Sequence, residues 1–75
     1  MRTNLYEQLA DDLRRKIKNG EYRPGSKLPS RSELRATLGI SDAVIARAVW
    51  ILKREGLVEP RMGSGLYVVE VLPES

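Results

Sequence analysis

Two short helices, each opened by its own capping residue and separated by a tight turn, are predicted in the middle of this chain. Ser30 is followed three residues later by Glu33, the spacing of a capping box in which side chain and backbone satisfy each other's N–H groups. Gly39 is expected to end the first helix, about Arg31–Leu38, because a residue with positive φ suits the position after a helix. Ser41 then caps the second helix. This arrangement is typical of a helix-turn-helix, which holds its second helix where it can enter a DNA major groove.

Another helix is predicted before this motif. Asn4, with Glu7 at the third helical position, is expected to start it, and Gly20 to stop it. Apolar residues recur on one face at steps of three or four: Tyr6, Leu9, Ala10, Leu13 and Ile17. The last turns carry four cations: Arg14, Arg15, Lys16 and Lys18. Cations complement the negative end of a helix dipole, and we favour this interpretation, with a solvated face, over direct phosphate contact.

The segments on either side of the two capped helices complete the predicted fold. Arg23–Ser26 has Pro and Gly at the two central positions of a type II turn. The third helix should run from about Asp42 to Glu55, with Gly56 as its stop. Its core-facing residues are expected to be Ile45, Ala48, Val49 and Leu52, which share one side.

Two apolar runs rich in Val follow, at 57–60 and 66–72, separated by the segment 61–65 that contains two glycines. Such runs predict a β-hairpin. The predicted fold is α+β, mainly α: a winged helix-turn-helix with three helices followed by a β-hairpin wing. We expect the 75 residues to form one domain.

Composition excludes most kinds of chemistry. The chain has no Cys and no His, which removes disulfides, thiolate or imidazole metal sites, and the usual general bases and nucleophiles. We therefore expect no enzyme, no metal and no cofactor. No apolar run reaches the ~20 residues that span a bilayer, and the N-terminus lacks a signal peptide's apolar core, so a cytoplasmic, nucleoid-associated location is predicted. Thirteen Lys and Arg against ten Asp and Glu give a net charge of +3, which fits a polyanionic partner.

Five segments form a joint pattern: Leu5–Gln8, Gly20–Ser30, Leu38–Ser41, Glu55–Val58 and Gly63–Val68. On these segments the chain resembles the DNA-binding domain of the GntR family of bacterial transcription regulators, over nearly its whole length. The resemblance implies a sequence-specific regulator, a repressor, that occupies a palindromic operator in double-stranded DNA as a homodimer. It also implies that the third helix enters the major groove and the wing reaches the minor groove. Most family members continue into an effector-binding domain, so this chain is expected to be a free-standing small regulator or an excised domain.

The chain departs from the family at three positions. Family members usually carry Arg at the positions of Ser32, Asp42 and Ala46, where it contacts guanine and phosphate. Arg31 and Arg47 stand one residue away from two of these positions. One residue is a rotation of about 100° on an α-helix, so they are not simple replacements. The usual arginine contacts are therefore not carried over to this chain.

The outer side of the third helix, opposite its core-facing residues, carries Ala43, Ala46, Arg47, Trp50, Lys53 and Arg54. If this side meets DNA, Arg47 is predicted to bridge guanine O6 and N7, and Ala43 or Ala46 to touch a thymine methyl group. Ser41, which caps the helix, is also predicted to contact DNA. For Asp42 we favour a carboxylate that complements the helix dipole over one that accepts a hydrogen bond from cytosine N4, because nearby phosphates repel it.

Backbone contacts are predicted from the second helix and its entrance, by Lys27, Ser30, Arg31 and Arg35, which would set register rather than read sequence. In the wing, the turn 63–65 needs glycine φ angles. It is also expected to bring Gly63, Ser64 and Gly65 close to the minor groove, with Arg61 on a phosphate or in the groove.

Trp50 and Ile51 are unusual, because two adjacent apolar residues, one of them Trp, stand in a normally polar part of a recognition helix. Packing under the hairpin and contact with a protein partner both explain them. Two other functions therefore stay open: a winged-helix protein-interaction module, and a DNA-architectural or recombination accessory protein.

Overall fold

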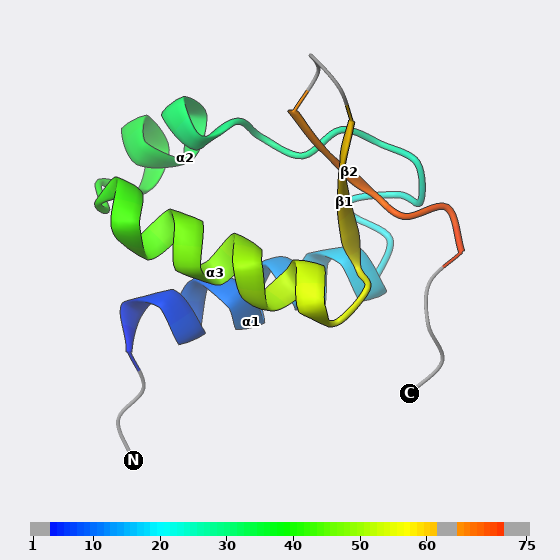
Figure 1. The fold of residues 1–75 in the computed structure, drawn as a ribbon, viewed down its shortest axis with the longest axis horizontal. Helices are drawn as coiled ribbons and strands as arrows, with labels where there is room; N and C mark the ends of the chain where they lie inside the picture. Colours follow the sequence, from blue (N-terminus) through cyan, green and yellow to red (C-terminus); the bar gives the residue numbers. More distant parts are fainter. Residues whose placement is uncertain (1–3, 62–64, 72–75) are drawn as a thin grey trace.

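The computed structural model describes residues 4–61 and 65–71. Three helices, α1 (Leu5–Lys18), α2 (Arg31–Leu38) and α3 (Asp42–Arg54), precede an antiparallel hairpin of β1 (Val58–Arg61) and β2 (Gly65–Val68) (Figure 1). The predicted α+β winged helix-turn-helix is confirmed. In this part of the chain, no helix has the length and apolar character needed to span a bilayer.

The predicted caps define the helix-turn-helix. The Ser30 amide donates to Glu33 Oε1 at 2.8 Å, and the Glu33 amide donates to Ser30 Oγ at 3.1 Å, which closes the capping box. Gly39 follows α2 with φ +68°, a left-handed conformation that costs glycine little. Ser41 Oγ accepts from the Val44 amide at 3.3 Å and starts α3. Both helices therefore begin where the sequence predicts.

The end of α3 and the strand limits differ slightly from the predictions. The helix ends at Arg54, and Glu55 is its C-cap, because Gly56 turns the chain with φ +77°. The two strands lie at 58–61 and 65–68 rather than at 57–60 and 66–72. Helix and strand ends commonly shift by one or two residues. The second strand ends four residues before its predicted end, because pairing with β1, which local sequence does not fix, stops at Val68.

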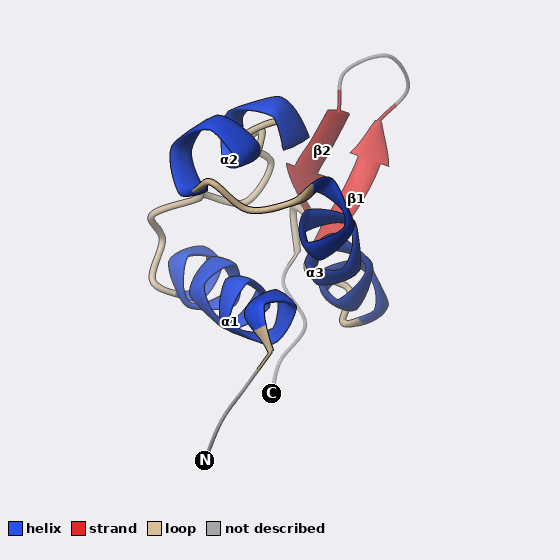
Figure 2. Ribbon diagram, turned by 90° about the vertical axis from the view of Figure 1, so that its left-hand side faces the viewer, coloured by secondary structure: helices blue, strands red, loops and turns tan. Residues whose placement is uncertain are grey.

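Helix α3 lies at the centre of the fold, packed against α1, α2 and β1. Its four predicted core residues are all buried, and Ile45, Ala48 and Leu52 are 0% exposed. The rest of the described core is also aliphatic: Leu9, Ala10, Leu13, Ile17, Leu28, Leu34, Leu57, Val58 and Val68. This packing fixes α3 by its inner side and leaves its outer side free, as the end-on view of Figure 2 shows.

The segment before α2 pairs with the edge of β2 that does not face β1. A type II turn is confirmed by Gly25 at φ +83° and by the Ser26 amide, which donates to the Arg23 carbonyl at 3.0 Å. The following residues then pair with β2: the Val68 amide donates to the Ser26 carbonyl at 2.9 Å, and Lys27 forms a bridge with Tyr67. The turn therefore attaches Lys27 to the base of the wing.

Candidate nucleic-acid interface

A hollow of about 330 Å³ lies where the start of α2, the C-terminal half of α3 and the hairpin meet. Apolar side chains form part of its wall: Pro29, Leu34, Val49, Pro60 and Leu66. Polar and charged residues complete it, namely Ser30, Arg31, Lys53 and Arg61, together with Gly65. The hollow combines the elements that a winged helix-turn-helix presents to DNA, namely the start of its first motif helix, its recognition helix and its wing.

Three cations at this hollow form no ion pair within residues 4–61 and 65–71. Arg31 and Lys53 line it, and Lys27 has its Nζ 3.6 Å from the position that a Cβ on Gly65 would occupy. The ion pairs of the described residues involve none of these three side chains. The charges of Arg31 and Lys53 are therefore available to an anion outside the chain, whereas the charge of Lys27 also helps to lower the pKa of Glu33.

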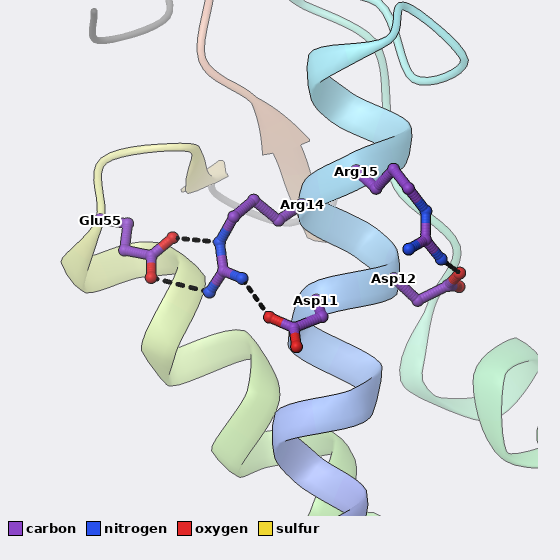
Figure 3. A network of polar contacts seen from close by, with 5 residues as sticks. All are labelled: Asp11, Asp12, Arg14, Arg15 and Glu55. Carbon is purple, nitrogen blue, oxygen red and sulfur yellow. Dashed lines mark hydrogen bonds and ion pairs between the residues drawn. The ribbon is translucent and has the colours of Figure 1, made fainter. Parts of the chain in front are cut away.

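The basic cluster of α1 is in the opposite state. Arg14 pairs with Asp11 and Glu55, and Arg15 pairs with Asp12 at 3.0 Å (Figure 3). Asp12 also pairs with Lys16. The hydrogen bonds to Glu55 raise the pKa of Arg14, and the charge of Asp12 raises the pKa of Lys16. Acidic neighbours offset three of the four cations, Arg14, Arg15 and Lys16, which agrees with the interpretation that they are not phosphate contacts.

The first turn of α2 contains an acidic residue, Glu33, that is bound by the chain itself. The Glu33 carboxylate accepts the Ser30 amide, and the backbone and hydroxyl of Ser30 hold the pKa of Glu33 below its ordinary value. The Ser30 amide and hydroxyl oxygen are thus engaged in the cap. Ser30 accordingly fixes the start of α2, and the neighbouring Arg31 is the residue there that extends a charge into the hollow.

The start of α3 is linked to the end of α2 by an ion pair. Arg35 Nη1 lies 3.7 Å from Asp42 Oδ1, and about half of each side chain is exposed, 51% and 54%. Ser41 and Ala43, predicted to contact DNA, are also exposed. Asp42 therefore has a partner beyond the helix dipole, one that the sequence alone does not predict.

Arg47 points toward α1. Its guanidinium lies 5.2 Å from the ring centroid of Tyr6 and 5.5 Å from that of Trp50, and Arg54 covers Trp50 at 5.0 Å. The hollow lies on the α2 side of α3, so the structure does not bring Arg47 together with Arg31 or the wing. The prediction that Arg47 reads guanine stays untested.

Trp50 is 48% exposed, so its predicted alternative of burial under the hairpin is wrong. Successive residues of an α-helix are rotated by about 100°, so Trp50 lies about 140° around α3 from the buried Ile45. This places it on the outer side of the helix. Ile51 is half-buried and lines a hollow with Ala10 and Arg14 of α1. Of the two residues, Trp50 is therefore the one open to a partner.

Arg61 lies along the hairpin. Its guanidinium is 4.4 Å from the ring centroid of Tyr67, 3.2 Å from Glu59 and 3.7 Å from Glu70. Gly65 adopts φ +98°, while Gly63 and Ser64 lie outside the described residues. The predicted contacts of the wing turn therefore stay predictions.

Lys53 was not among the predicted DNA-binding residues, although the structure places it in the hollow. The signal was present in the sequence, because Lys53 stands four residues after Val49 and thus on the same side of α3.

Fold and hollow together define a winged helix-turn-helix protein with a cationic face. The model of the bacterial regulatory proteins of the gntR family matches residues 5–68, and the chain belongs to this family. Among curated relatives, the Exu regulon transcriptional regulator of Escherichia coli K12 is 42% identical over 69 residues, which are 92% of this chain and 27% of the relative. The mannosyl-D-glycerate transport/metabolism system repressor MngR of the same strain is 39% identical, over 88% of this chain and 28% of the relative.

Solved structures agree. The DNA-binding domain of AraR, in complex with operator ORR3, superposes with a TM-score of 0.86 at 28% identity, covering 92% of this chain and 83% of that one. A GntR family transcriptional regulator from Listeria monocytogenes gives a TM-score of 0.87 at 29% identity, over 92% of this chain and 60% of that one. The chain spans about a quarter of the length of the curated relatives named above.

Proposed function

We propose that this chain binds double-stranded DNA sequence-specifically, as the single operator-binding domain of a transcription regulator. The observation that carries the proposal is the set of three cations at the hollow, Lys27, Arg31 and Lys53, which form no ion pair in the described chain. The AraR domain, which has the same fold, was solved in complex with an operator.

In the proposed complex, α3 enters the major groove and presents its N-terminal residues to base edges. Arg31 and Lys27 contact the phosphate backbone on either side of the hollow, and Lys53 contacts it from the end of α3. The wing reaches the adjacent minor groove. Contacts of this kind fix the register of α3 on the duplex.

We propose further that two copies occupy a palindromic operator and repress transcription by blocking a promoter, without catalysis, at the bacterial nucleoid. Palindromic operators mirror the two-fold symmetry of the proteins that bind them. The name of the relative MngR as a repressor supports the direction of regulation.

The test is selection of bound duplexes from a random pool, followed by titration of the selected duplex at several salt concentrations. Log affinity should fall linearly with log salt, with a slope of about −0.9 for each neutralised phosphate. Replacing Lys27, Arg31 or Lys53 by Gln should each reduce the slope by about 0.9 per lost contact.

Arg15→Gln is the matched control, because Arg15 is equally cationic but is paired with Asp12 on α1. It should leave the slope unchanged. Absence of duplex binding at low salt, or an equal effect of Arg15→Gln and Arg31→Gln, would contradict the proposed interface.

A second candidate function is contact with a protein through Trp50. The observation that favours it is the 48% exposure of this side chain between two arginines, since exposed Trp and Arg are typical of interaction sites. Measuring the molecular mass of the protein in solution, with and without operator, tests it. Self-association of the free protein would support this candidate if Trp50→Ser abolishes it.

A further inference from the structure

We infer that the Arg35–Asp42 ion pair is a specificity-determining element, in which Asp42 accepts a hydrogen bond from the N4 amino group of an operator cytosine and Arg35 positions its carboxylate. This inference rests on the proposed DNA-binding function. It assigns a base to a residue that the dipole interpretation treats as structural.

The position of Asp42 is the first argument. Asp42 is the first residue of α3, directly after its cap Ser41. In a helix-turn-helix the N-terminal residues of the second helix contact base edges. The Asp42 side chain is 54% exposed, so it is neither buried in the core nor used in the cap.

Charge is the second argument. An isolated carboxylate at this place would be repelled by the DNA phosphates. Arg35 Nη1 lies 3.7 Å from Asp42 Oδ1, so a cation offsets that repulsion, and the α3 dipole favours an anion at the same end. The pair joins the end of α2 to the start of α3, which restricts where the carboxylate can point.

The chemistry of the base edges selects cytosine. A carboxylate only accepts hydrogen bonds, and in the major groove cytosine presents a donor, N4, without an acceptor of its own. Adenine also presents a donor, N6, but its N7 acceptor lies beside it, and guanine and thymine present O6, N7 or O4 acceptors. Acceptors repel a carboxylate, so cytosine is the base that suits Asp42.

The experiment removes one amino group from the DNA. Each cytosine of the selected operator is replaced in turn by 2-pyrimidinone, in which hydrogen stands in place of the 4-amino group. At one position in each half-site the affinity of the unchanged protein should fall about fivefold to a hundredfold. For Asp42→Ala the same replacement should change affinity less than twofold, which couples the carboxylate to that amino group.

Two further variants separate base reading from a structural role. Asp42→Asn should shift the selected base at that position from cytosine toward adenine, because an amide can pair with adenine N6 and N7 together. Arg35→Gln should reduce the sensitivity to 2-pyrimidinone while circular dichroism stays native. Asp12→Ala, which removes a paired carboxylate from α1, is the control and should leave that sensitivity intact.

The outcomes are distinguishable. The unchanged protein, Asp42→Ala and Asp42→Asn could all select the same operator, tightly and with salt dependence. That result overturns the inference and leaves the proposed function standing. Equal sensitivity of Asp42→Ala and the unchanged protein to 2-pyrimidinone also overturns it. Failure of the unchanged protein to select any duplex overturns both.

Discussion

The guanidinium of Arg47 lies 5.2 Å from the ring centroid of Tyr6 and so connects the outer side of α3 to the first turns of α1. Trp50 lies against the same guanidinium at 5.5 Å. Cation–π contacts at exposed sites are worth about 0.5–1 kcal/mol each. The contact gives Arg47 a role within the fold in addition to any contact with DNA.

Arg47→Ala should lower the free energy of unfolding by about 1 kcal/mol. Because the guanidinium is held on the α1 side, the variant should also lower the affinity for the selected operator and for a random duplex to the same extent, as loss of a phosphate contact does. Urea unfolding and paired titrations measure the two effects. A loss of ~1–3 kcal/mol on the operator alone would instead make Arg47 the base reader that the sequence predicts.

Trp50 is the only Trp of the chain and reports on the outer side of α3. Since 48% of the side chain is exposed, its fluorescence in the free protein should be that of a largely hydrated indole. Addition of operator should shift the emission to shorter wavelength, because the proposed complex covers this side of the helix. Trp50→Phe supplies the background. Emission that is unchanged at saturating operator would show that Trp50 stays outside the complex.

Glu33 makes stability depend on pH. Its pKa is lowered by hydrogen bonds from the Ser30 backbone and hydroxyl, so the folded state favours the carboxylate form. The stabilisation is therefore fully present above the unfolded pKa of roughly 4.3 and is lost as pH falls through the lower folded pKa. Glu33→Gln should melt earlier than the unchanged protein at pH 7. The difference should shrink toward pH 3, and a constant difference over this range would contradict the role of the carboxylate.

Local signals predicted the parts of this fold that depend on neighbours in sequence. The capping box of Ser30 and Glu33 and the glycine after α2 each act within a few residues, and each is confirmed. The buried side of α3 followed from periodicity alone. Such features need no knowledge of how the elements are packed together.

The contacts that characterise the candidate site are long-range, which is why the sequence did not predict them. Lys27 is attached to β2 through pairing across about forty residues, between segments that only the folded chain brings together. The contact of Arg47 with Tyr6 depends on how α3 crosses α1, and the pairing of Arg61 with Glu70 depends on the path after β2. Side-chain direction on a helix is predictable, but its partner on another element is not.

The wing offers a test with an internal control. Gly65 has φ +98°, a conformation that disfavours a side chain, and a Cβ there would lie 3.6 Å from Lys27 Cε and Nζ, an ordinary contact. Gly65→Ala should therefore cost about 1–2 kcal/mol of stability through its backbone, not through a clash. Because Gly65 lines the hollow, the affinity of the Gly65→Ala variant for the operator should fall further than its unfolded fraction explains.

Gly20 is the matched position, with φ +89° and no heavy atom of another residue within 4 Å of an added Cβ, apart from its chain neighbours. It follows α1, and it does not line the hollow. Gly20→Ala should lower the melting temperature by a similar amount while leaving the affinity of the folded protein unchanged. Thermal melts and operator titrations at a temperature where both variants are folded make the comparison. Equal binding by the two variants would mean that Gly65 serves only the geometry of the turn, and that the wing makes no close backbone contact with DNA at this residue.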